Sequence, residues 1–208
     1  MKRSIAYAAA LVTVFAWGLE YATAKSAQQE LSAAVLGFWM FATAAAGTCL
    51  LSLISPTMRP TWRRLGEPRL LTWCLLIGAT GITINFFALH GIRLTTAANS
   101  AILARTEILF ALLLGLFVYR ERVQMGAVVW IPLMLVGVLL VMQIDPSRFR
   151  LRNWGDVFIL VSALGVSLNG FWIKHVLRDL PGPVIAAVNT GANALFFFVV
   201  SMGEGAGP

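Results

Sequence analysis

The sequence has few charged residues for its length. Of its 208 residues, 12% are Asp, Glu, Lys or Arg and 59% are hydrophobic, and the mean hydropathy is +0.80. A soluble globular domain carries about 25% charged residues. The composition therefore excludes an ordinary soluble globule and predicts a chain that mostly contacts lipid.

Cysteine and histidine are also scarce. Cys49 and Cys74 both fall within apolar runs, where a thiol behaves as a small hydrophobic side chain, so we expect no disulfide framework. His90 and His175 lie near the ends of apolar runs, and the sequence holds no phosphate-binding loop and no nucleophile beside an evident base. We therefore expect no enzymatic activity, no metal site and no cofactor.

The excess of basic residues has a topological explanation. The net charge of +7 comes from short clusters between apolar runs, whereas a nucleic-acid-binding protein gathers such residues on one polar face. Loops rich in Lys and Arg stay on the cytoplasmic side of a membrane. With the N-terminus inside, the inner loops hold Lys2, Arg3, Arg59, Arg63, Arg64, Arg69, Arg120, Arg122, Lys174 and Arg178. The smaller outer set is Lys25, Arg93, Arg148, Arg150 and Arg152. We expect a cytoplasmic N-terminus and, without a targeting peptide, a bacterial inner membrane location.

Seven runs are apolar over the length of about 20 residues that a helix needs to cross a hydrocarbon core of about 30 Å. They are Ile5–Ala24, Ala33–Ile54, Leu70–Leu89, Thr95–Tyr119, Val123–Met142, Trp154–Lys174 and Pro181–Met202. A cleaved signal peptide is the alternative for the first run, which follows Lys2 and Arg3. That run continues through Phe15, Trp17 and Leu19, beyond the length of a typical hydrophobic region of a signal peptide, which favours a retained span. The sequence predicts an all-α, polytopic integral membrane protein of about seven transmembrane helices.

The chain is similar to itself at an offset of 149 residues, which aligns Lys25 with Lys174. In both copies an apolar run ends at the lysine, a short polar link follows and a second apolar run begins. Chance alignment of helices rich in leucine and alanine is the alternative. A first unit of five helices, an odd number, would make the second unit enter the membrane from the opposite side. Such inverted repeats are typical of secondary transporters, which bind cargo between the two units.

Several short motifs resemble those of a known family in their order and spacing. They are Trp17-Gly18 before Lys25, Ala88-Leu89 before Thr95 to Ala98, Glu107, Glu121, Gly137-Val138-Leu139, and Gly155-Asp156 at the start of the sixth run. Together they resemble the EamA-type unit of the drug/metabolite transporter superfamily. The resemblance implies ten helices in two five-helix units, with both termini in the cytoplasm.

The resemblance divides the chain into residues 5–142, a first five-helix unit, and residues 154–208, two helices of an incomplete second unit. We therefore expect a truncated chain or a shortened relative. Ile108 stands where the family commonly has proline, and the second run lacks the arginine that the family often carries there. The implied function is a secondary transporter, an exporter of small metabolites, amino-acid-like compounds or drugs by alternating access. The alternative is an accessory membrane protein or an inactive unit that needs another chain. Coupling to protons and homo-oligomerisation stay open.

Charged residues inside the apolar runs are candidates for the transport site. A charge at the centre of a transmembrane helix costs about 2.5–3.5 kcal/mol on insertion scales, so it requires a partner or a water-filled cavity. Arg105 lies near the middle of the fourth run and can pair with Glu20 in the first. Glu107 lies about 200° from Arg105 on an ideal helix, so we expect these two side chains to face different helices. Arg105 is expected to attract an anionic or zwitterionic cargo and a carboxylate to carry a coupling proton. A structural ion pair is the alternative, favoured for Glu107.

Neutral side chains complete the predicted substrate-binding set of Arg105, Glu20, Asn85, Asn169 and Trp17. Asn169 occupies the repeat position of Glu20, and Trp17 can shape an aromatic pocket. For the asparagines, including Asn189 and Asn193 at i, i+4 spacing, the alternative is interhelical hydrogen bonding worth about 0.6–2 kcal/mol. Lys25 and Lys174 end their runs, where we expect them to extend to the headgroups and complement a helix dipole.

Overall fold

The computed structural model describes residues 3–118, 120, 126, 129, 132, 133, 136 and 153–205, without the side chains of residues 3–6. Its elements are α1 (Arg3–Ala27), α2 (Ala33–Ile54), α3 (Thr61–Arg64), α4 (Pro68–Leu94), α5 (Ala97–Ala104), α6 (Glu107–Leu113), the π-helical turn η1 (Leu114–Val118), α8 (Trp154–Val176) and α9 (Gly182–Gly203). Every one of these elements is helical, which confirms the all-α prediction.

Five helical segments are long and apolar enough to cross a membrane. They are Ala33–Ile54, Pro68–Leu94, Ala97–Val118, Trp154–Val176 and Gly182–Gly203. Each corresponds to one of the predicted spans, so the chain is a multi-pass membrane protein. The predicted span Ile5–Ala24 lies within the 25-residue helix α1, which is not among these five. The predicted span Val123–Met142 falls outside the continuous described ranges and stays a prediction.

The starts of the helices follow from residues that cap or initiate helices. Ser32 accepts a hydrogen bond from the backbone N–H of Val35 at the start of α2, and Asn153 does the same for Asp156 at the start of α8. Proline occupies the first turn of α4 and of α9, where its missing N–H costs nothing. The residues at which these helices begin are therefore determined by the local sequence.

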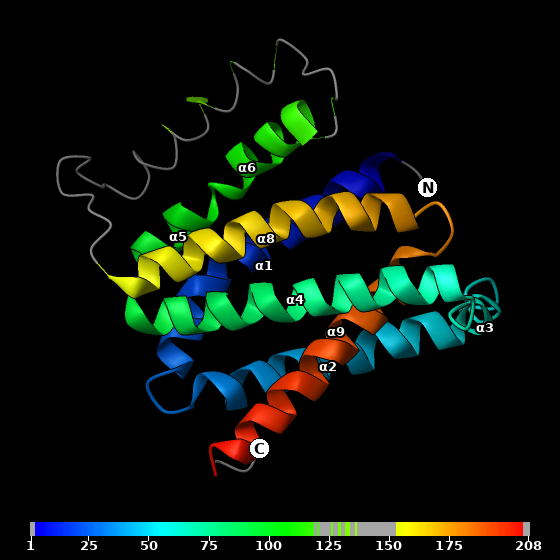
Figure 1. Ribbon diagram of the computed structural model, residues 1–208, viewed down its shortest axis with the longest axis horizontal. Coiled ribbons are helices and arrows are strands. Elements are labelled where there is room, and N and C mark those ends of the chain that lie inside the picture. Colours follow the sequence, from blue (N-terminus) through cyan, green and yellow to red (C-terminus); the bar gives the residue numbers. More distant parts are fainter. Residues whose placement is uncertain are drawn as a thin grey trace.

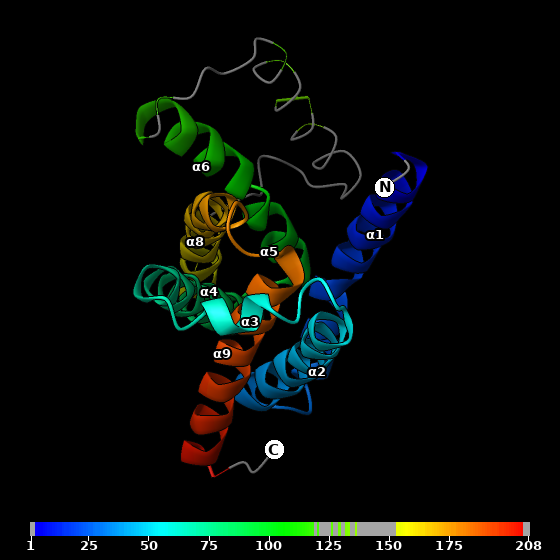
Figure 2. The ribbon, with the colours of Figure 1, turned by 90° about the vertical axis from the view of Figure 1, so that its right-hand side faces the viewer.

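The helices stack in an order that the chain sequence alone does not show. Both views place α8 between α6 and α4, with α2 and α9 on the opposite side of α4 (Figures 1 and 2). The most extensive helix contacts are those of α2 with α9 and of α4 with α8. A buried cluster that includes Leu89, Leu103, Ile159 and Phe197 joins these helices to α1 and α5. Helices from both ends of the chain thus form one bundle.

The fourth predicted span is not one continuous helix. α5 ends at Ala104 and α6 begins at Glu107. Between them the N–H of Arg105 bonds to the carbonyl of Ile102, and that of Thr106 to Leu103, which is the tighter i to i−3 pattern. The expectation of an unbroken helix from Thr95 to Tyr119 is therefore wrong, and the break falls at Arg105.

Lys25 caps the end of a neighbouring helix. Its Nζ donates to the carbonyl oxygens of Ile92 at 2.7 Å, Arg93 at 2.9 Å and Thr95 at 2.8 Å, at the C-terminal end of α4. The last carbonyls of a helix have no partner within the helix and carry partial negative charge. The lysine complements a helix dipole as expected, but the helix is α4 and not its own.

Lys25→Met is expected to lower the thermal unfolding temperature of the detergent-solubilised protein. The change leaves three carbonyls at the C-terminal end of α4 without a charged donor, and hydrogen bonds to charged groups contribute about 1.5–3 kcal/mol. Arg93→Met is the matched control, because it removes a positive charge at the same end of α4 while the Arg93 side chain makes no hydrogen bond within the described residues. Equal unfolding temperatures for the two variants would contradict the capping role.

Candidate functional site

A cavity of about 450 Å³ lies among α1, α2, α4, α6, α8 and α9. Its volume is within the range of roughly 300–1,000 Å³ that is usual for small-molecule sites. All five residues of the predicted substrate-binding set line it: Trp17, Glu20, Asn85, Arg105 and Asn169. The structure thus gathers side chains from α1, from α4, from α8 and from the turn between α5 and α6 around one space. Their role in binding stays a prediction.

Arg105 forms an ion pair with Glu107 at the wall of this cavity. Arg105 Nη1 lies 3.6 Å from Glu107 Oε1, and the two side chains are 28% and 24% exposed. The expectation that they face different helices is wrong, because the break between α5 and α6 removes the regular 100° step between residues. The expected Glu20–Arg105 pair does not form within 4 Å in the described part of the chain.

Three asparagines form a hydrogen-bonded ladder between α4 and α9. Asn85 Nδ2 donates to the Gly81 carbonyl and to Asn193 Oδ1, each at 2.9 Å. Asn193, fully buried, donates in turn to the carbonyl and to Oδ1 of Asn189. Gly81 permits this approach, since a β-carbon there would overlap the Asn189 side-chain oxygen. Asn85 and Asn189 also line the cavity, so the ladder is both a helix contact and part of the wall.

Asn169 holds a buried acceptor that has no donor. The residue is 6% exposed, and its Oδ1 makes no hydrogen bond within the described residues. Most buried polar atoms in proteins are satisfied, so an exception needs an explanation. Asn169 also lines the cavity.

Aromatic and apolar side chains form another part of the wall. Tyr21 on α1 and Phe41 on α2 line the cavity together with Trp17 and Met40. Phe41 is fixed by stacking on Phe197, with ring centroids 5.8 Å apart. Tyr21 is not in the predicted set, although its spacing of four residues from Trp17 places both on one face of α1. Phe41 is not in that set either, and the sequence gives no comparable signal for it.

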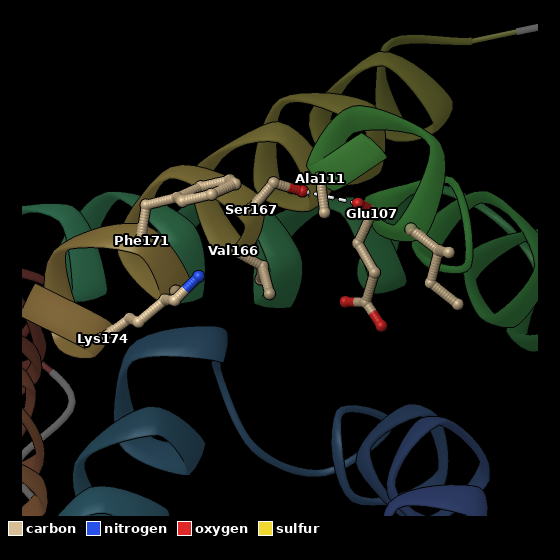
Figure 3. Close-up of a pocket in the computed structure, with 8 residues that line it drawn as sticks. Glu107, Ala111, Val166, Ser167, Phe171 and Lys174 are labelled. Carbon is tan, nitrogen blue, oxygen red and sulfur yellow. Dashed lines mark hydrogen bonds between the residues drawn. The ribbon is translucent and has the colours of Figure 1, made fainter. Parts of the chain in front are cut away.

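A smaller cavity of about 280 Å³ adjoins the first between α6 and α8. The two cavities share Glu107, Val166 and Gly170. Ser167 Oγ donates to the backbone oxygen of Glu107 at 2.6 Å, while the Glu107 carboxylate points the other way (Figure 3). This bond ties the start of α6, directly after the helix break, to α8.

Residues 4–143 match a family described as EamA-like transporters. The chain belongs to this family. A protein of Methanothermobacter thermautotrophicus described as an "uncharacterized transporter" is 25% identical over 117 residues, which cover 55% of this chain and 34% of that protein. A Salmonella typhimurium protein described as a "probable amino-acid metabolite efflux pump" is 25% identical over 184 residues, 86% of this chain and 56% of that protein.

This EamA-like chain thus spans between a third and just over half of the length of these curated relatives. No solved structure matches it. The family is described as one of transporters, in agreement with the resemblance found in the motifs.

Proposed function

We propose that this EamA-like protein is a secondary transporter that exports small, amino-acid-like metabolites across the cytoplasmic membrane by alternating access. The observation that carries the proposal is the polar cavity among membrane-spanning helices. Arg105 and Glu107 lie in the middle of the span Ala97–Val118, where isolated charges are costly. Their ion pair and their partial exposure to the cavity offset this cost. Ionisable groups retained at such a depth commonly mark a pathway for substrates or ions.

The description of one relative supports the class of cargo and the direction. The Salmonella protein is described as a "probable amino-acid metabolite efflux pump", and its match covers 86% of this chain. An amino acid offers an ammonium and a carboxylate, and the cavity offers carboxylates, a guanidinium and amides. A carboxylate in the same cavity is also the group that we propose for any proton coupling.

We further propose a first unit at residues 5–142 and the first two helices of a second at residues 154–208. The 149-residue offset aligns α1 with α8 and α2 with α9. α2 and α9 form one of the two most extensive helix contacts, and the aligned residues Glu20 and Asn169 both line the cavity. Inverted repeats bind cargo at such an interface and move one unit against the other.

The proposed orientation places the N-terminus in the cytoplasm. The N-terminus, α3 and the link between α8 and α9 lie at the same end of the bundle (Figure 1). There Arg64 Nη1 donates to the carbonyl of Asp179 at 2.9 Å, which holds the two links together. The basic residues of these links, among them Arg59, Arg63 and Arg178, belong at the cytoplasmic face by the positive-inside rule.

Flux of labelled amino acids in proteoliposomes tests the function, with a variant that fills the cavity. Gly170 lines the cavity, and a β-carbon there meets nothing within 4 Å, so Gly170→Leu adds volume without a backbone clash. We expect flux above protein-free liposomes and a fall of about tenfold or more in Gly170→Leu, equivalent to about 1.4 kcal/mol. Gly191→Leu, on α9 and equally unobstructed, is the control.

The outcomes separate the two functions under consideration. Flux that survives in Gly170→Leu as in Gly191→Leu would exclude this cavity as the pathway. Folded protein that carries no amino acid in either direction would favour the alternative, a unit that works only with another chain or copy.

A further inference from the structure

The charges of the cavity point to a narrower class of cargo, on the basis of the transport proposed above. We propose that the cavity selects molecules that carry a protonated amine, and that it does not require a carboxylate on them. The inference rests on the balance of charge, on two acceptors of the wall, and on the aromatic side chains.

The described residues that line the cavity carry more negative than positive charge. Glu20 and Glu107 face a single guanidinium, that of Arg105. Arg105 is engaged by Glu107 at 3.6 Å, so Glu20 is the carboxylate without an ion-pair partner among the described residues. A cationic cargo balances this charge, whereas an anionic cargo would add a second unbalanced negative charge inside the spans. Arg105 is thereby assigned to neutralising Glu107 and not to holding a cargo carboxylate.

Two neutral side chains of the wall offer hydrogen-bond acceptors to a cargo. Both amide hydrogens of Asn85 are used, by the Gly81 carbonyl and by Asn193, so its Oδ1 is the group left for cargo. The buried Oδ1 of Asn169 has no donor in the described part of the chain. A protonated primary amine brings three N–H donors and no acceptor. It therefore matches Glu20, Asn85 and Asn169 better than a carboxylate does.

The aromatic side chains suit the same group. Trp17 and Tyr21 come from the helix that carries Glu20, and Phe41 lies on α2. Aromatic faces attract ammonium groups through the ring quadrupole, most strongly when water is excluded. An amine held at Glu20 is thus next to a wall that stabilises positive charge and also accepts an apolar tail.

Direct binding to the purified 208-residue chain tests the inference with three related probes. Leucine is a zwitterion, leucinamide a cation and N-acetylleucine an anion. We expect leucinamide to bind with a Kd within about threefold of that of leucine, and N-acetylleucine to bind at least about tenfold more weakly, measured by calorimetry or by tryptophan fluorescence. Failure of leucinamide to bind, or equal binding of N-acetylleucine, would overturn the proposal.

Glu20→Gln supplies the matched variant, because it keeps the side-chain shape and removes the charge. Its Kd for leucinamide is expected to rise about tenfold, while Glu30→Gln, an exposed carboxylate in the link between α1 and α2, leaves the Kd unchanged. Asn169→Asp places a carboxylate where the unpaired Asn169 Oδ1 lies. The added negative charge is expected to lower the Kd for leucinamide. Unchanged affinity in Glu20→Gln would refute the role of Glu20.

The same measurements distinguish this inference from the proposed function. Preference for leucinamide over N-acetylleucine without flux in proteoliposomes would uphold the amine site and reject transport by this chain. Flux of leucine with equal binding of leucinamide and N-acetylleucine would uphold transport and reject the amine site.

Discussion

Gly155→Ala is expected to lower the unfolding temperature of the protein, because the new β-carbon meets backbone. It would lie 2.8 Å from Cβ of Leu94 and 2.9 Å from both the carbonyl carbon of Leu94 and the nitrogen of Thr95. Backbone atoms at the end of a helix cannot rotate away as a side chain can. Overpacking of this kind costs about 1–3 kcal/mol, or about 2–12 °C for a chain of this size.

Thermal unfolding in detergent measures the effect, with Gly191→Ala as the control. A β-carbon at Gly191 meets nothing within 4 Å, so this variant carries the same chemical change within a helix without the clash. Equal unfolding temperatures for the two variants would contradict the prediction, because they would show that α8 can shift away from α4 without a loss of stability.

The contact at Gly155 is one of several interactions at the C-terminal end of α4 that hold α1, α4 and α8 together. We call this set the joint, and it also sets the position of the cavity walls. Next to it, Thr95 Oγ1 donates to the buried carboxylate of Asp156 at 2.6 Å, and Asn153 Nδ2 donates to the Leu94 carbonyl at 3.1 Å. Lys25 joins α1 to the same end of α4. The joint thereby links the two helices that carry Glu20 and Asn169. We expect Gly155→Ala to weaken binding in the cavity as well as the fold.

The membrane-spanning helices were predictable from the sequence because hydropathy and length indicate which segments cross lipid. The residues at which these helices end were harder to predict. The third span was predicted at Leu70–Leu89, but α4 continues to Leu94 through His90 and Arg93. A hydropathy criterion stops at these polar residues, whereas the helix continues because Lys25, a residue distant in sequence, satisfies its last carbonyls.

The candidate site was predictable to the extent that polar residues inside apolar runs must turn away from lipid. That argument selected Glu20, Asn85, Arg105 and Asn169, and all four line one cavity. It failed at the Arg105–Glu107 pair, because helical periodicity assumes an unbroken helix. The break coincides with side-chain bonds to backbone oxygens, including that of Thr106 Oγ1 to Leu103 at 2.6 Å. Ser167 on α8 also donates to the Glu107 carbonyl, a contact that periodicity does not contain.

Arg105→Ala is expected to reduce transport about tenfold or more at matched abundance in the membrane. Removal of the guanidinium leaves Glu107 unpaired beside Glu20, and an uncompensated charge in a span costs about 2.5–3.5 kcal/mol. Flux in proteoliposomes measures the loss, and Arg178→Ala, an exposed arginine outside the cavity, is the control. Undiminished transport in Arg105→Ala would remove Arg105 from the site.

The double variant Arg105→Ala/Glu107→Gln decides between two roles for this arginine. If Arg105 neutralises Glu107, removing both charges restores the balance around Glu20, and the double variant is expected to regain most of the flux lost in Arg105→Ala. If Arg105 instead holds a cargo carboxylate, the double variant stays as slow as the single one, because the contact is still missing. A slow double variant that binds leucinamide as the wild type does would place the loss in the carboxylate contact and return Arg105 to the role expected from the sequence.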